Sequence, residues 1–293
     1  MASAVKSIAL QKPPADQPTT AGETYQSAEA VEAWRRAAAR RAETYGAATE
    51  LMLDLAEIGP GCRVLDVAAG AGDQTLLAAR RVGPSGYVLA VDISAAMLAV
   101  AADAASEAGL TNVETCVLDA RSLDLESDSF DAAISRFGIM LIPDPVKALA
   151  EAMRVLKPGG KLSVAVFSTP EKNPYLAIPQ AIARRHAGLP EPAPGDPGQF
   201  ALGAPGAVEN AYAKAGFRVV RVLSVSTTRR FASTEEAIQT MKDTSVRLRQ
   251  LMDGLSDAER DRVWSDVEQE LNQFQGSTGL ELAGEVLVCV GTK

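Results

Sequence analysis

Short apolar runs alternate with longer amphipathic stretches along the middle of the chain. The runs that favour β-strands cover residues 63–67, 87–92, 113–118, 130–135 and 161–167. Apolar residues at helical spacings occupy the segments between these runs. This alternation is typical of a doubly wound α/β fold, in which a parallel sheet is built with right-handed crossovers. We therefore expect ligands to bind beyond the carboxyl ends of these strands.

Helical patterns flank this core on both sides. Residues 27–58 predict two helices that meet near Gly46 and lie over the ligand end of the sheet. Residues 170–206 hold eight of the sixteen prolines, and a loop of this length is usually functional or mobile. The other expected elements are a helix over 177–185, a helix over 207–215, a strand over 218–230, two helices within 233–275 that begin with the capping boxes Ser233–Glu236 and Ser256–Glu259, and a strand over 280–291.

Composition and charge narrow the possible partners. The 293 residues carry a net charge of −8, which argues against nucleic acid because binding to its backbone needs clustered basic residues. His186 is the single histidine, so a multi-histidine metal site is excluded and no metal is expected. The chain shows neither a long apolar run nor a signal-peptide pattern, and its three cysteines predict reduced thiols. We expect a cytoplasmic protein with a small-molecule partner and no membrane insertion; its oligomeric state stays open.

The segment RVLDVAAGAGDQT, residues 63–75, predicts a nucleotide pocket. An apolar strand ends there in a turn built on Gly70 and Gly72, and a helix follows. The dinucleotide fingerprint GxGxxG requires Gly or Ala three residues after the second glycine, but this chain has Thr75 there. Asp92 ends the second strand, where an acid can accept hydrogen bonds from ribose hydroxyls of NAD or of any other adenosine ligand. These residues alone do not choose between cofactors.

The third strand adds a preference. It ends in Asp119 and Ala120, where the carboxylate can accept from an adenine amino group while the Ala120 amide donates to a ring nitrogen. A fourth strand follows in residues 129–138, and Leu156–Gly160 then predicts a tight turn into the fifth strand.

In this order, the pieces resemble class I S-adenosylmethionine-dependent methyltransferases, of the group that includes the ubiquinone/menaquinone biosynthesis enzymes and many small-molecule methyltransferases. The likeness covers roughly residues 44–168, and it departs from the family's ExGxGxG because Asp66 stands for the acid and Ala68-Ala69 replace the more frequent Gly-Cys. It implies a Rossmann-like, seven-stranded, mostly parallel sheet whose last strand is antiparallel, with helical lid insertions. It also implies S-adenosyl-L-methionine as cofactor, bound by Asp66, Ala68, Gly70, Gly72, Asp73, Asp92, Ile93, Met97, Asp119, Ala120, Arg136 and Phe137.

Composition and the order of the expected elements predict a division of the chain. We expect a disordered leader over 1–24, an N-terminal helical lid over 25–58, a cofactor-binding α/β core over 59–168, a lid insertion over 169–206, and the C-terminal part of the core over 207–293 with a helical cap over 233–275.

The expected reaction is an in-line methyl transfer to an oxygen or ring carbon of a small acceptor, such as a phenol, quinone or indole of secondary metabolism. Candidate catalytic residues are His186 as a general base, and Tyr25 and Tyr175 beside the acceptor. Each has a structural alternative, since His186 can be a surface residue at a helix end and the tyrosines can serve packing. An NAD-dependent oxidoreductase and a non-catalytic S-adenosylmethionine-binding protein remain alternatives.

Overall fold

The fold is built on one mixed sheet with strand order β3-β2-β1-β4-β5-β8-β6. The computed structural model describes residues 27–193 and 195–293. The strands are β1 (Arg63–Val67), β2 (Tyr87–Asp92), β3 (Val113–Val117), β4 (Phe130–Arg136), β5 (Leu156–Phe167), β6 (Arg218–Phe231), β7 (Gln275–Gly276) and β8 (Gly279–Thr292). Strands β1 to β5 are parallel, whereas β8 is antiparallel to both β5 and β6. The predicted fold class is confirmed, with the short β7 as an additional strand beside β8.

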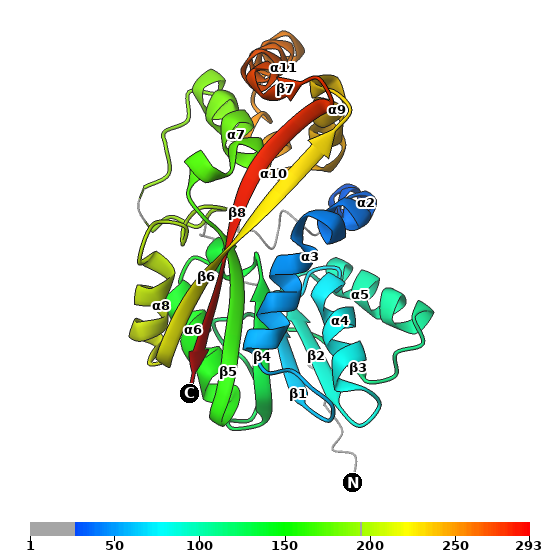
Figure 1. Cartoon of the computed structure of the whole chain (residues 1–293), viewed down its shortest axis with the longest axis vertical. Helices are drawn as coiled ribbons and strands as arrows, with labels where there is room; N and C mark the ends of the chain where they lie inside the picture. The colour runs from blue at the N-terminus through cyan, green and yellow to red at the C-terminus, as the bar shows by residue number, and fades with distance from the viewer. Residues whose placement is uncertain (1–26, 194) are drawn as a thin grey trace.

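Helices cover both faces of the parallel part (Figure 1). They are α2 (Ala28–Arg36), α3 (Ala38–Leu55), α4 (Asp73–Val82), α5 (Ala95–Glu107), α6 (Pro145–Val155), α7 (Pro174–His186), α8 (Ala207–Ala215), α9 (Thr234–Thr244), α10 (Val246–Leu251) and α11 (Asp257–Leu271). Helices α3, α4 and α5 lie on one face, and α6 packs against α8 on the other. Within the described residues, no helix has the length and apolar character needed to cross a membrane.

Burial explains why the central strands pair in parallel. All but the first residue of β1 are buried, and the four central residues of β2 are buried as well. Such continuous apolar strands suit a sheet that is covered by helices on both faces. Strand β6 instead alternates between more exposed and more buried positions toward its end, as an antiparallel strand with one solvated face does.

The order of the strands determines where a ligand crevice forms. Strand β1 lies between β2 and β4, with Asp66 opposite Ala90 on one side and Ile134 on the other. Because β2 and β4 follow β1 in opposite directions across the sheet, a crevice forms beyond the carboxyl ends of these strands.

Strands β6 and β8 form a long hairpin that carries a second hydrophobic core. Their pairing continues from Arg221 opposite Val290 to Phe231 opposite Leu280, whereas β5 pairs with β8 only over residues 286–292. Helices α7, α9, α10 and α11 gather around the far end of this hairpin (Figure 1), and we call these four helices the cap. Their buried residues form an apolar cluster separate from that of the main sheet.

Three predictions about helices are corrected. The N-terminal helices divide at Ala37 and not near Gly46, which lies inside α3. Residues 233–275 form three helices because the Ser245 hydroxyl accepts a hydrogen bond from the Leu248 amide and so begins α10. Only Ser256–Glu259 is a complete capping box, since Glu236 accepts from the amide of Ala232 and not from that of Ser233.

The predicted turn at Leu156–Gly160 instead belongs to β5. Leu156 pairs with Phe130, and Lys161 pairs with Ala132. An advance of five residues along β5 therefore corresponds to an advance of two residues along β4. The extra residues form a bulge, in which Gly159 has a φ of +82°. The turn residues therefore distort a strand where a loop was expected.

Candidate cofactor and acceptor site

The glycine turn after β1 contains two glycines that are needed for different reasons. Both have positive φ, +57° at Gly70 and +84° at Gly72. A Cβ on Gly72 would lie 2.8 Å from Cβ of Ala101 on α5, so this glycine permits close helix packing. A Cβ on Gly70 would meet nothing within 4 Å. Gly70 therefore borders open space, as a residue that faces a ligand should.

Asp92 at the end of β2 ties this turn to the next helix. Its carboxylate accepts hydrogen bonds from the amides of Gly70 and Ser94, each at 2.9 Å. Burial raises the pKa of Asp92, although these backbone hydrogen bonds oppose the shift. A carboxylate has about four acceptor positions, so the amides of Gly70, Ser94 and Ile93 leave acceptor capacity for a hydroxyl group of a ligand.

Asp66 lies beneath the turn and is fully buried. Its oxygens accept from Oγ1 of Thr75 at 2.6 Å and from Nε2 of Gln74 at 3.0 Å. Burial raises the pKa of Asp66 to about 7, despite these two hydrogen bonds. Thr75, which fits the dinucleotide fingerprint poorly, thus has a role of its own in holding Asp66.

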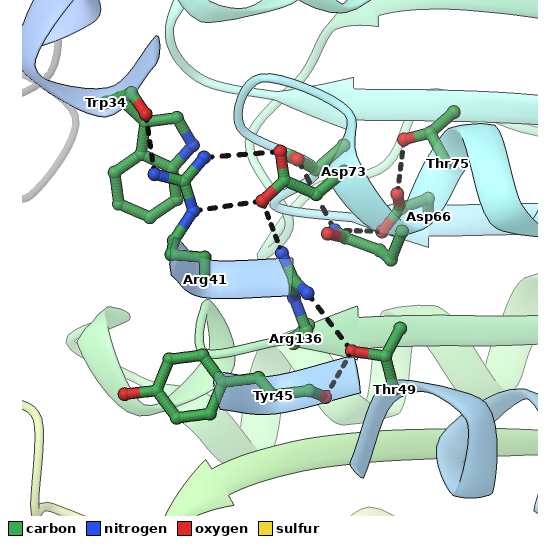
Figure 2. Close-up of polar contacts among 10 residues, drawn as sticks. Trp34, Arg41, Tyr45, Thr49, Asp66, Asp73, Thr75 and Arg136 are labelled. Carbon is green, nitrogen blue, oxygen red and sulfur yellow. Dashed lines mark hydrogen bonds and ion pairs between the residues drawn. The ribbon is translucent and has the colours of Figure 1, made fainter. Parts of the chain in front are cut away.

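Asp73 opens α4 and binds two arginines from distant parts of the chain (Figure 2). Arg41 of α3 donates to both carboxylate oxygens, at 2.9 and 3.2 Å, and Arg136 at the end of β4 donates at 2.7 Å. Burial raises the pKa of Asp73, but the hydrogen bonds and charges of the two arginines outweigh it and hold the pKa below its usual value. Asp73 also lies in the first turn of α4, where the helix dipole favours a negative charge.

Helix α3 supplies this cluster from one face. Arg41, Tyr45 and Thr49 follow each other at intervals of four residues and are all buried. Arg136 donates to the Thr49 hydroxyl at 3.0 Å, and this hydroxyl donates to the Tyr45 carbonyl at 2.9 Å (Figure 2). The Arg41 guanidinium also stacks 4.0 Å from the ring centre of Trp34 and donates to the Trp34 carbonyl. The N-terminal helices are therefore bonded directly to the glycine turn.

The residues expected near the adenine differ in how far they are exposed. Asp119 forms an ion pair with Arg121 at 2.7 Å. Burial alone would raise the pKa of Asp119, but the hydrogen bonds and the charge of Arg121 outweigh burial and hold the pKa below its usual value. Ala120 is buried and Ile93 is 41% exposed, whereas Met97 is 2% exposed and packs against Ala71. Asp92 and Ile93 thus face the open edge, and Met97 belongs to the packing beneath it.

Phe137 directly follows Arg136 and belongs to a cluster of aromatic side chains. It has a φ of +59°, which turns the chain sharply at the end of β4. Its ring stacks on Phe167 with centroids 4.3 Å apart and meets the edge of Tyr45 at 4.8 Å. Ala68, whose φ is +54°, lies against Gly138, because a Cβ added there would come within 2.4 Å of Cβ of Ala68.

Of the three candidate catalytic residues, His186 and Tyr175 are described by the structure, and both belong to α7. Tyr25 and the predicted leader over residues 1–24 lie outside the described residues. His186 ends α7, and its Nε2 lies 2.8 Å from a carboxylate oxygen of Asp266 on α11, so its partner is in the cap. Tyr175 begins α7 and stacks on Phe231 with centroids 5.4 Å apart. Burial raises the pKa of Tyr175 to about 12, so its hydroxyl stays protonated at neutral pH.

Several residues of the site were missed in the sequence. Arg41 and Thr49 had a detectable signal, because they flank Tyr45 at intervals of four residues on one face of a helix. Arg229 of β6 had none, because only the folded hairpin brings it to the Tyr45 hydroxyl, to which it donates a hydrogen bond. Gln74 lies inside the motif, but nothing in its position indicated a bond to Asp66.

These residues fit S-adenosyl-L-methionine. The open side of Gly70 leaves space beside the acceptor positions of Asp92. At the end of β4 the Ser135 hydroxyl is buried without a hydrogen-bond partner in the described part of the chain. A Cβ on Gly138 would lie 3.1 Å from this hydroxyl, so Ser135 belongs to the same crevice. A ligand with ribose hydroxyls and a polar amino-acid end matches these groups.

Comparison with known proteins agrees with this reading. Residues 58–190 match the family described as Methyltransferase domain. The ubiquinone/menaquinone biosynthesis C-methyltransferase UbiE of Bordetella parapertussis is 46% identical over 113 residues, which are 39% of this chain and 43% of that protein. The UbiE of Teredinibacter turnerae is 42% identical over 122 residues, 41% of this chain and 49% of that protein. The chain thus spans less than half the length of these curated relatives.

Solved structures share the fold. The YcgJ protein of Bacillus subtilis matches with a TM-score of 0.57 and 21% identity, over 85% of this chain and 98% of that chain. Phosphoethanolamine N-methyltransferase 2 of Haemonchus contortus matches with a TM-score of 0.60 and 20% identity, over 94% of this chain and 61% of that chain. Residues 58–190 therefore match a methyltransferase domain, and the sheet that carries them has the fold of these solved structures.

Proposed function

We propose that this protein transfers a methyl group from S-adenosyl-L-methionine to a small organic acceptor. The observation that carries the proposal is the arrangement at the ends of β1 and β2, where Asp92 retains free acceptor positions beside the open face of Gly70. Asp92 would bind the ribose hydroxyls, and Asp119 with Ala120 would contact the adenine edge. Ala68, Arg136 and Phe137 would surround the methionine end.

The bound cofactor would supply a methyl group that is already activated by its sulfonium charge. The protein then has to orient the two reactants and exclude water, and alignment alone can lower a barrier by about 7 to 11 kcal/mol in favourable systems. Arg41 and Arg136 hold the glycine turn through Asp73, which keeps this edge rigid. The helices within residues 25–58, 169–206 and 233–275 would serve as lids.

A positioned proton acceptor is not required by this proposal. The raised pKa of Tyr175 disfavours the tyrosinate that would act as a base, and the His186 ring is hydrogen-bonded to Asp266. An acceptor whose own carbon or oxygen is nucleophilic suits such a site. The curated relatives are named C-methyltransferases of ubiquinone and menaquinone biosynthesis, which makes ring carbons of quinol-like and phenolic molecules the first acceptors to test.

Two measurements test the proposed function. Calorimetric titration with S-adenosylmethionine and, separately, with NAD should show binding of the former and none of the latter. Turnover with radiolabelled S-adenosylmethionine and a panel of quinols, phenols and indoles should then transfer label to at least one acceptor. Binding of NAD alone would favour the oxidoreductase alternative. Binding of S-adenosylmethionine with no transfer to any acceptor would favour a non-catalytic binding protein.

A further inference from the structure

Arg229 of β6 borders a small cavity next to the crevice. The residues around this cavity come from α3, α7 and the β6–β8 hairpin: Tyr45, Asn173, Tyr175, Leu176, Thr227, Arg229, Leu282, Ala283 and Gly284. The space between them is about 10 Å³, roughly the room of one water molecule. Because its walls belong to separate elements, a small shift of α3 or α7 against the hairpin would enlarge it.

The charge of Arg229 has no acidic partner in the described part of the chain. Its two neighbours in space and sequence each have one: Arg230 pairs with Glu281 at 2.8 Å, and Arg40 pairs with Glu236 at 3.2 Å. Arg229 instead donates to the Tyr45 hydroxyl and lies over aromatic rings, 4.3 Å from the centre of Tyr175 and 5.2 Å from that of Tyr45. None of the residues around the cavity is acidic.

The aromatic rings compensate this charge only in part. A cation over an aromatic ring gains less free energy than a guanidinium gains from a carboxylate that it binds with two parallel hydrogen bonds. One donor of Arg229 is used by Tyr45, and the planar group has five in all. The remaining donors have no hydrogen-bond partner within residues 27–193 and 195–293 and can serve a ligand.

Tyr45 connects this cavity with the cofactor crevice. Its ring contacts Phe137 at the end of β4, with centroids 4.8 Å apart, while its hydroxyl accepts from Arg229. Its carbonyl accepts from Thr49, which in turn accepts from Arg136. The cavity is therefore one aromatic side chain away from the expected methionine end of the cofactor.

We propose that Arg229 binds a carboxylate of the methyl acceptor when a shift of α3 or α7 enlarges this cavity, with the planar ring of the acceptor against Tyr45 and Tyr175. The acceptor is then an aromatic or quinol-like carboxylic acid. This inference rests on the proposed methyl transfer only for the role of the ligand, because carboxylate binding at Arg229 can be measured without turnover. Charge-assisted hydrogen bonds in a partly buried site are stronger than those to a neutral amide, so the site should discriminate between an acid and its amide.

Matched pairs of probes test this selectivity. The Kd of 4-hydroxybenzoate is compared with that of 4-hydroxybenzamide, and that of indole-3-acetate with that of indole-3-acetamide, by titration of the full chain with and without S-adenosylhomocysteine. The wild-type protein should bind at least one acid about tenfold or more tightly than its amide, which corresponds to about 1.4 kcal/mol. Arg229→Gln should abolish this preference, and Arg229→Lys should retain part of it.

Arg230→Gln is the matched control, since it removes the same charge from the next position of β6, where the side chain is exposed and paired with Glu281. It should leave the preference unchanged. Equal binding of acid and amide in both pairs, or a preference that survives Arg229→Gln, would overturn the proposal. If Arg229→Gln does not fold, as judged by circular dichroism, Arg229→Lys and Tyr45→Phe decide, because both should reduce the preference. Failure to bind S-adenosylmethionine would refute the proposed function but leave the acid–amide comparison valid.

Discussion

At the residue scale, Asp92 has the clearest expected effect on the cofactor. Asp92→Ala should weaken S-adenosylmethionine binding by about 1 to 3 kcal/mol, because ribose hydroxyls would lose a charged acceptor. The Gly70 and Ser94 amides would also lose their partner, so the turn should loosen. Calorimetric titration of the variant measures the Kd. Asp103→Ala removes an exposed acid from α5 and should leave the Kd unchanged; an unchanged Kd for Asp92→Ala as well would contradict the assignment.

Asp66 should make stability depend on pH. Its pKa of about 7 in the folded protein lies above the usual value of an aspartate, so the folded state keeps the proton over a pH range in which the unfolded state loses it. Stability from this group is complete below about pH 4 and is lost as the pH rises through 7. Between pH 5 and 8 the free energy of unfolding of the wild type should fall by about 2 to 3 kcal/mol more than that of Asp66→Asn.

Urea unfolding of the ligand-free protein at several pH values measures this difference. Thr75→Val provides a second check, because the Thr75 hydroxyl bonds to the ionised carboxylate and its loss should move the decrease to higher pH. Parallel pH dependences for the wild type and Asp66→Asn would show that burial does not raise the pKa of Asp66.

Residues of the site differ in how far the sequence reveals them. Gly70, Gly72 and Asp92 are predictable because a strand, a tight turn and a helix impose local requirements on neighbouring positions. Arg229 is not, because its partner Tyr45 lies 184 positions away in the chain. Arg41 has only the spacing of its helix face as a signal, since its partner Asp73 lies 32 positions away. Asp73 is intermediate: its position in the motif was evident, but the two arginines that bind it meet only in the folded protein.

At the element scale, the Arg41–Asp73 ion pair joins α3 to α4. Both side chains are largely shielded, with exposed fractions of 10% and 22%. Arg41→Ala should lower the free energy of unfolding by about 1 to 3 kcal/mol, less than the loss of a fully buried pair, because Asp73 keeps its bond to Arg136. The Kd for S-adenosylmethionine should rise as the turn loosens.

Urea unfolding of Arg41→Ala, Asp73→Asn and the double variant measures the coupling between the two side chains. Arg80→Ala, which removes an exposed arginine from α4, is the control and should have little effect. Additive effects of Arg41→Ala and Asp73→Asn would mean that the pair does not stabilise the junction.

The element boundaries show why the fold was more predictable than its details. Strong apolar runs located β1, β2 and β4 within a residue or two, since burial on both faces requires such runs. Gly46 did not end a helix, because the flanking turns of α3 have packing partners that offset the low helix propensity of one glycine. Leu156–Gly160 joined β5 because pairing with β4 accommodates a bulge.

At the scale of the whole molecule, the protein has two large apolar cores, one in the main sheet and one in the cap. Leu271 of α11 is fully buried in the cap cluster, and Leu162 of β5 is fully buried in the main one. Leu271→Ala should destabilise the cap by about 2 to 5 kcal/mol through the cavity that it creates. Hydrogen exchange should then accelerate in residues 234–274 while the amides of β1 to β5 stay protected.

Leu162→Ala is the matched substitution in the main core and should accelerate exchange throughout the sheet. Mass-spectrometric hydrogen exchange of both variants separates the two patterns. Equal acceleration in β1 to β5 for the two variants would show that the cap and the main sheet unfold as one cooperative unit.

The paired strands β6 and β8 also constrain how the protein can diversify. Thr227, Arg229 and Phe231 alternate with more exposed residues, so a one-residue insertion in β6 would turn this set to the opposite face of the hairpin. A lineage that keeps the hairpin length can exchange the side chain at position 229 by a point mutation. This position is far in sequence from the glycine turn. Divergence among descendants of such a protein is therefore expected to accumulate as substitutions at every second position of these strands, with insertions confined to the loops.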